Sequence, residues 1–343
     1  MKKFLVALFG FSTFYVACKT TTVPTSSLEG KKIDDALLIP QFVRFNEPLK
    51  AIEASLAGAS NIDDAAKKFV SGPARVAAYQ LQALGKLYED ESKWFKDLKD
   101  EFRTIEDTIG EYDKWNNILT KASSSLTSEK KVELEGFRQD GLKAVKKLLK
   151  DQDWFGTPKT RAEKLRNQLA KFDWKKPSKD RTMVLGYIAN EAAKMRDTKY
   201  NLENLEKGKG LHELRRDMKW LLIEMRVLNG LVLKNTSACP FSEYAALVKT
   251  PIANSKYSEL PFSNQERNPC LIPECLFLGL VQAVEDIGRL KDDAEFRLNT
   301  TEKDKDRDKM PADLKATADQ FYKGIQDGQL FDRTSEAINS CQR

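Results

Sequence analysis

Apolar residues recur at three- and four-residue spacing through most of the chain, which is the spacing of one face of an α-helix. No segment shows a convincing pair of alternating strands. The sequence therefore predicts an all-α protein. The predicted helices lie at 72–91, 94–121, 128–150, 159–172, 181–206, 210–232 and 274–299, with one more opened by Pro311 and a short one ending near Cys341.

Four segments interrupt the helical pattern. Proline and polar residues break it at 174–180 (WKKPSKD), and glycine and lysine break it at 207–210 (KGKG). The stretch 237–273 is rich in Pro, Ser and Asn, and we expect an ordered insertion because long structureless loops are unusual in compact domains. Residues 301–309 (TEKDKDRDK) are expected to form a charged loop.

A faint repeat relates the two halves of the chain. The segment 75-RVAAYQLQALGKLY-88 resembles the helix at 210–232 in placing an arginine near the start of an amphipathic run. Similarly, 105-IEDTIGEYD-113 resembles 284-VEDIGRLKDD-293. Repeats of this length indicate duplication of a whole helical bundle. We therefore expect a first helical bundle at 34–176 and a second at 177–343 that contains the insertion.

The N-terminus reads MKKFLVALFGFSTFYVACKT, in which two lysines precede an apolar run that is too short for a stable membrane anchor. We expect a removable signal peptide at 1–17. The run ends in YVAC, which resembles a bacterial lipobox with Cys18 as the lipidated residue. Tyr15 departs from the usual leucine, but it would also hinder the alternative, ordinary A-x-A cleavage. Residues 18–33 are expected to form a flexible tether.

These features predict a protein of the bacterial cell envelope that is anchored in a membrane through Cys18. Lys19 stands where an aspartate would retain lipoproteins at the inner membrane, so we expect the outer membrane, facing the periplasm.

Export also affects how the remaining cysteines are interpreted. An oxidising compartment favours disulfides among Cys239, Cys270, Cys275 and Cys341. Zinc binding is the alternative, but one histidine and no C-x-x-C pair disfavour a metal site. Four cysteines allow three connectivities. We expect Cys239–Cys270 to close the insertion and Cys275–Cys341 to tie the C-terminal helix to the helix that begins near Glu274.

The net charge limits the kinds of ligand. The formal charge is +6, and removal of the signal peptide lowers it by two. This is too mild for specific or general nucleic-acid recognition, which shows a stronger basic footprint. Any anion site must therefore be a local cluster of basic residues.

Such a cluster is present in 210-GLHELRRDMKWLLIEMRVLNGLV-232, which contains the only histidine of the chain. Each helical residue turns the side-chain direction by about 100°. Glu213, Asp217 and Glu224 fall on a different side from the basic residues, whereas an ordinary solvated helix interleaves them as ion pairs. The basic group covers roughly one third of the circumference and consists of His212, Arg215, Arg216, Lys219 and Arg226.

Two interpretations of this basic stripe remain open. It can be a surface stripe that pairs with acids of a neighbouring helix, or an anion site in which guanidinium groups bind phosphate oxygens bidentately. Nothing nearby supplies a nucleophile or a second histidine, so we expect no catalytic site, no metal and no cofactor.

The stripe also resembles a known family. Within 211-LHELRRDMKWLLIEM-225, His212, Arg215 and Lys219 match the H-x-x-R-x-x-x-K/R signature of the conserved-histidine α-helical domain (CHAD) family. The later segment 280-LVQAVEDIGRLKDD-293 is similar to that family's L-Q-x-x-L-G-x-L-x-D segment, with Gly288 and Asp292 at the matching places.

The first half departs from the family pattern. Gly72 stands where the histidine would be, and Asp113 comes one residue early. Three basic positions of the family's R-V-A-x-R-R-L-R-x-L segment are replaced by Tyr79, Gln80 and Gln82.

The resemblance implies two related four-helix bundles and a central basic groove that binds inorganic polyphosphate. Its contacts would be His212, Arg215, Lys219 and Arg226, with Arg216 flanking and Arg75 and Lys86 contributing from the first half. The degenerate first half could leave a weak site, a site for a shorter anion, or none. A second hypothesis is an envelope scaffold or interaction lipoprotein that keeps the fold without the ligand, and an enzyme is the least expected.

Overall fold

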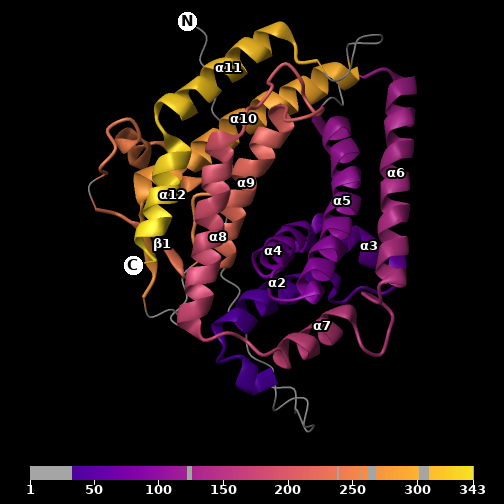
Figure 1. Ribbon diagram of the computed structural model, residues 1–343. Helices are drawn as coiled ribbons and strands as arrows, with labels where there is room; N and C mark the ends of the chain where they lie inside the picture. The colour runs from indigo at the N-terminus through magenta and orange to yellow at the C-terminus, as the bar shows by residue number, and fades with distance from the viewer. Residues whose placement is uncertain are drawn as a thin grey trace, which may run out of the picture.

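The computed structural model describes residues 33–121, 126–237, 239–255, 257–261, 268–300 and 309–342. These ranges form a predominantly helical protein, as Figure 1 shows. The expected signal peptide, Cys18 and nearly all of the tether lie outside the described residues.

The first half of the structure, residues 33–176, is built around α4 and α5 (Figure 1). The helix α4 packs against α5 and α2, α5 packs against α6, and α7 packs against α2. Side-chain caps begin several of these helices, and Thr160 and Glu163 form a capping box at α7. The helices are α2 (Pro40–Leu56), α3 (Ile62–Ser71), α4 (Ala74–Leu87), α5 (Lys93–Lys121), α6 (Ser128–Asp151) and α7 (Arg161–Ala170).

The second half, residues 177–342, also contains several long helices. The helix α9 packs against α10 and α8, and α12 packs against α8. The described parts of the insertion contain two short 3-10 helices, η1 (Ala245–Lys249) and η2 (Pro251–Asn254). The helices are α8 (Pro177–Asp197), α9 (Leu211–Val227), α10 (Glu274–Thr300), α11 (Ala312–Asp327) and α12 (Leu330–Ser340).

The prediction that no strands pair is wrong at one place. The strands β1 (Val232–Asn235) and β2 (Cys270–Pro273) form a small parallel sheet, with Val232 opposite Cys270. The strand β1 precedes the insertion and β2 forms its last four residues, so their pairing closes the insertion at its base. Four residues are too few to show a strand periodicity in the sequence.

One predicted helix is displaced at both ends. The helix α8 begins at Pro177, inside the predicted break, because proline suits the first position of a helix. It ends at Asp197 and not near residue 206. Leu202 and Leu205 have helical spacing, but they are buried from a loop that leads into α9.

The two halves meet mainly where α4 packs against α9. At this contact the rings of Tyr79 and Trp220 lie 5.6 Å apart. A buried polar group reinforces the junction, because Arg44 of α2 pairs with Asp180 of α8 at 2.7 Å. The hydroxyl of Tyr88 donates to the same carboxylate at 2.7 Å. These packed side chains fix the position of the two halves relative to each other.

The predicted disulfide connectivity is wrong. The structure joins Cys239 to Cys275 and Cys270 to Cys341, with Cα–Cα distances of 5.9 and 5.1 Å. The helix α12 packs against both α8 and β2, which brings Cys341 beside Cys270 at the start of β2. Cys275, near the start of α10, pairs with Cys239 of the insertion. Because all four thiols are in disulfides, none is available as a zinc ligand.

Candidate functional site

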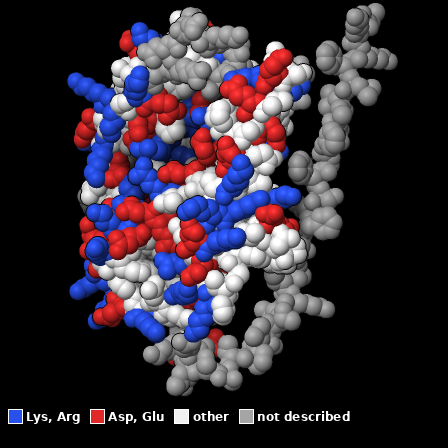
Figure 2. All heavy atoms as spheres, turned by 90° about the vertical axis from the view of Figure 1, so that its right-hand side faces the viewer, with Lys and Arg blue, Asp and Glu red and all other residues white. Residues whose placement is uncertain are grey.

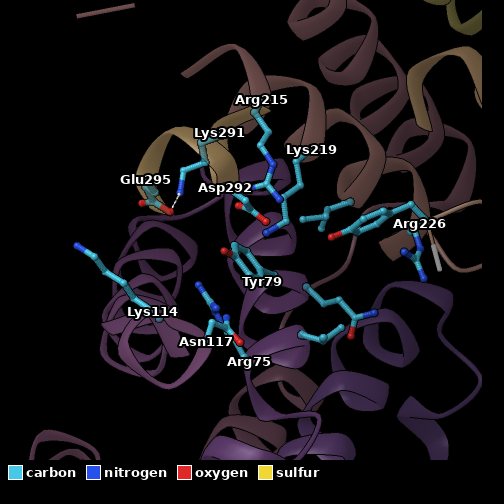
Figure 3. Close-up of a pocket in the computed structure, with 15 residues that line it drawn as sticks. Arg75, Tyr79, Lys114, Asn117, Arg215, Lys219, Arg226, Lys291, Asp292 and Glu295 are labelled. Atoms are coloured by element: carbon cyan, nitrogen blue, oxygen red, sulfur yellow. Dashed lines mark ion pairs between the residues drawn. The ribbon is translucent and has the colours of Figure 1, made fainter. Parts of the chain in front are cut away.

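A cleft runs between the halves, with α4 and α5 on one wall and α9 and α10 on the other (Figure 3). It comprises two adjoining cavities of about 460 and 650 Å³. Volumes of this size are typical of small-molecule sites. The residues that line both cavities are Arg75, Tyr79, Gly110, Arg215, Lys219 and Lys291.

All of the predicted anion-binding residues line this cleft. The larger cavity is lined by six of them, and the smaller one adds Arg226. The cleft therefore brings the basic stripe of α9 together with basic residues of α4, which are far away in the sequence. The six residues on the larger cavity are Arg75, Lys86, His212, Arg215, Arg216 and Lys219.

Arg215 lies against a glycine of the facing helix. A Cβ atom at Gly288 of α10 would lie 2.9 Å from Nε of Arg215, so the missing side chain leaves room for the guanidinium. That Nε is buried and has no hydrogen-bond partner. Within the described ranges, Arg215 makes no ion pair. Its positive charge is therefore not balanced by a contacting carboxylate there.

Arg226 has similar surroundings further along α9. Its Nε is also buried without a hydrogen-bond partner, and no ion pair holds it among the residues that the structure describes. Burial lowers the pKa of Arg226, and electrostatic attraction to Glu259 acts in the opposite direction. A desolvated cation of this kind favours a nearby negative charge.

Lys219 lies between these arginines on the helix and points to the opposite wall (Figure 3). Its Nζ lies 3.6 Å from the ring centroid of Tyr79, in cation–π geometry. Burial raises the pKa of Tyr79, so the ring stays a neutral phenol at physiological pH. The tyrosine thus positions the ammonium group within the cleft.

Two other members of the stripe have acidic partners. Nδ1 of His212 lies 3.1 Å from Glu206 in the loop before α9. Arg216 pairs with Glu213 of its own helix at 2.7 Å. The prediction that acids and bases are segregated on this helix is therefore wrong for Arg216, because the helical turn brings these two side chains together.

The basic residues from the first half are also paired. Arg75 contacts Glu106 at 3.0 Å and Asp113 at 2.8 Å, both on α5.

Lys86 contacts Glu191 of α8 at 2.9 Å and Glu224 of α9 at 3.1 Å. Glu224 is fully buried, and burial raises its pKa to about 7. Both basic residues of α4, Arg75 and Lys86, are thus ion-paired with acids of other helices.

Further residues of the cleft come from α5 and α10 and were not predicted from the sequence to bind an anion. Gly110, Lys114 and Asn117 lie on one face of α5, as their spacing of four and three residues requires. On α10, Lys291, Asp292 and Glu295 lie one to two turns after Gly288 and line the smaller cavity (Figure 3). Lys291 is paired with Glu295 at 2.8 Å. Their helical spacing from Gly110 on α5 and from Gly288 on α10 is the sequence signal that could have identified these residues.

The outer surface differs from the cleft. On the face that carries α5 and α6, lysines and arginines are interleaved with acids and form no large block of one sign (Figure 2). Many of these charges pair within one helix, as Lys147 does with Asp151 and Lys143 with Asp140. On this face, the positive charge is thus balanced locally.

Similarity to known proteins adds no functional assignment. No family model matches the chain, and neither a curated protein nor a solved structure matches it. Within the described ranges, no helix has the length and apolar character needed to cross a membrane. Function is therefore inferred from the cleft itself.

Proposed function

We propose that this protein is a non-catalytic envelope lipoprotein that binds a phosphate-rich anion, such as inorganic polyphosphate, in the cleft. The observation that carries this proposal is the pair of arginines on α9, Arg215 and Arg226, each with a buried Nε that lacks a partner. Both arginines are half-buried and no carboxylate contacts them among the described residues, and a bound anion would supply the opposite charge. Phosphate suits the site because its oxygens match the forked guanidinium donors.

We also propose that the halves arose by duplication and that the chain is a divergent member of the CHAD family. A parallel between the halves supports this. Arg75 lies over Gly110, where a Cβ atom would be 2.8 Å from its Nη2, just as Arg215 lies over Gly288. The sequence spacing from arginine to glycine is the same in both halves, to within one residue, when the insertion at 237–273 is left out.

A scaffold without an anion ligand is the second candidate. The ion pairs of Arg75 with Glu106 and Asp113 favour it, since they neutralise one side of the cleft. The two candidates differ in a measurable property, because only an anion site gives binding that weakens steeply with salt.

Calorimetric titration with polyphosphate at low ionic strength tests the proposal. The double change Arg215→Ala plus Lys219→Ala is expected to cost about 2–4 kcal/mol of binding free energy, the worth of two charge-assisted contacts. Helix content should be retained, because alanine favours the helix. A matched control is Lys130→Ala plus Lys131→Ala on α6, which removes the same charge away from the cleft.

Two outcomes contradict anion binding at this site. If the unaltered protein shows no salt-sensitive binding of polyphosphate, the scaffold function replaces the proposed one. If the α6 control loses as much affinity as the α9 variant, the attraction is diffuse charge and the cleft is not the site.

Anchoring is a separate part of the proposal. We propose that Cys18 is lipidated and holds the protein at the outer membrane, facing the periplasm. The lipobox-like YVAC sequence supports this. Cys18→Ser should then move the protein from the membrane fraction to the soluble fraction of bacterial cells. Unchanged membrane partitioning of the variant would show that Cys18 is not the anchor.

A further inference from the structure

The two arginines that lie over glycines have opposite electrostatic surroundings. Arg75, over Gly110, is held by two carboxylates on α5. Arg215, over Gly288, contacts no carboxylate as an ion pair in the part of the chain that the structure describes. The cleft therefore contains one arginine that acids neutralise and one that no acid contacts.

The difference follows from two positions on each facing helix. On α5, Glu106 precedes Gly110 by one helical turn and Asp113 follows it by nearly one turn, so both reach the arginine. On α10, the residues at the same offsets from Gly288 are Val284 and Lys291. An apolar residue and a cation thus stand where the first half has two acids.

The ion pairs of Arg75 leave it poorly suited to bind an anion. Its Nη2 donates to Glu106 at 3.0 Å and its Nη1 donates to Asp113 at 2.8 Å. The side chains of Glu106 and Asp113 are only 12% and 25% exposed, so water screens their charge incompletely. A phosphate that approached this wall would meet two carboxylates and donors that are already occupied.

We propose that Glu106 and Asp113 are specificity-determining residues that limit the cleft to a compact anion of a few phosphate groups. This rests on the proposed function and names its ligand class. The anion would occupy the smaller cavity of about 460 Å³, at the side where Arg215, Lys219 and Arg226 line it. The lining of this cavity also includes Arg75, Asp292 and Glu295. A longer polyphosphate would gain little from its additional phosphates, because Arg75 does not bind them.

The test compares pyrophosphate, tripolyphosphate and a long polyphosphate at one low salt concentration. For the unaltered protein, affinity should level off at tripolyphosphate, once the number of equivalent positions on the long chain is taken into account. The variant Glu106→Gln plus Asp113→Asn should bind the long chain about tenfold more tightly, the effect of one new charge-assisted contact. Its affinity for tripolyphosphate should rise much less.

Further variants separate the freed arginine from a general change of charge. Adding Arg75→Ala to the double variant should abolish the gain. The matched control Glu135→Gln plus Asp140→Asn removes two acids from α6, where they pair with Arg138 and Lys143. It should not alter the dependence on chain length.

The outcomes separate this inference from the proposed function. If no phosphate compound binds the unaltered protein, the proposed function fails. If phosphates bind but affinity keeps rising with chain length in the unaltered protein, only the restriction to compact anions is overturned. A gain that survives the addition of Arg75→Ala would equally overturn it.

Discussion

At Gly288, a Cβ atom would lie 2.9 Å from Nε of Arg215, so the position of this arginine depends on a side chain that is absent. The glycine lies within α10, where it costs about 1 kcal/mol of helix stability relative to alanine. In return, the absence of a Cβ atom lets the guanidinium of Arg215 lie directly against α10. Gly110 has the same relation to Arg75.

Gly288→Ala should therefore separate binding from stability. The added methyl group is expected to displace the guanidinium of Arg215 and to weaken tripolyphosphate binding about tenfold, the loss of one charge-assisted contact. The free energy of unfolding should stay equal or rise, because alanine favours the helix. Calorimetric titration and chemical denaturation measure the two effects.

Gly136→Ala on α6 is the matched control, because a Cβ atom there meets no other atom within 4 Å. It should give the same helix benefit and leave binding unchanged. Equal affinity of the two glycine variants would show that Gly288 does not position Arg215.

The pKa of the single residue Glu224 leads to a second prediction. Glu224 is fully buried beside Lys86, and burial raises its pKa to about 7 from an ordinary value of 4.5. A carboxyl whose pKa is raised on folding contributes stability that is fully present below the unfolded pKa and lost as pH rises through the folded pKa. The free energy of unfolding should thus fall relative to that of Glu224→Gln between about pH 4 and pH 7.

The expected change in this difference is at most about 3 kcal/mol, since one pKa unit corresponds to about 1.4 kcal/mol. Urea denaturation of both proteins at several pH values measures it. A difference that stays constant with pH would mean that Glu224 titrates alike in the folded and unfolded states.

Among the elements, α9 has a periodicity that is sufficient to place the basic stripe on one face. Helical geometry alone determines that Arg215, Lys219 and Arg226 share this face, so this part of the site is predictable from the sequence. The partners of Arg75 and Lys86 are not, because they come from α5, α8 and α9. Which residues form ion pairs depends on tertiary packing, and a single sequence does not encode it in a readable pattern.

The small sheet and the disulfides depend on tertiary packing in the same way. The strands are short: β1 precedes the insertion, β2 ends it, and α12 reaches β2 from the C-terminal end of the chain. Cys239 and Cys270 are closer in the sequence, which favours their pairing, whereas the packing of α12 brings Cys341 to Cys270. The cysteine chemistry is thus readable from the sequence, and the connectivity is not.

Removing each disulfide should destabilise the protein by about 2–4 kcal/mol. The loops span 36 and 71 residues, so the Cys270–Cys341 bridge closes a loop about twice as long as that of Cys239–Cys275. We therefore expect Cys270→Ser plus Cys341→Ser to cost about 0.6 kcal/mol more than Cys239→Ser plus Cys275→Ser. Denaturation of the two double variants measures this, and a reversed order would show that local packing outweighs loop closure.

For the whole molecule, the sequence predicts a boundary between the halves at 174–180, and α8 begins there, at Pro177. The way in which the halves join is not predictable from the sequence. Their junction combines the packing of α4 on α9 with the buried pair of Arg44 and Asp180. Both depend on residues more than a hundred positions apart in the chain.

The disulfides also have a consequence for the integrity of the chain. The two bridged intervals, 239–275 and 270–341, overlap at 270–275. Any single backbone cut between residues 239 and 341 therefore leaves both fragments covalently joined, whereas the sequential pairing would release them after a cut between 270 and 275. Protein nicked once by a protease in this region should run as one species on a non-reducing gel and as two after reduction. Two separate fragments without reductant would refute the interlocked pairing, and a single species means that this half of the protein survives cleavage as one molecule.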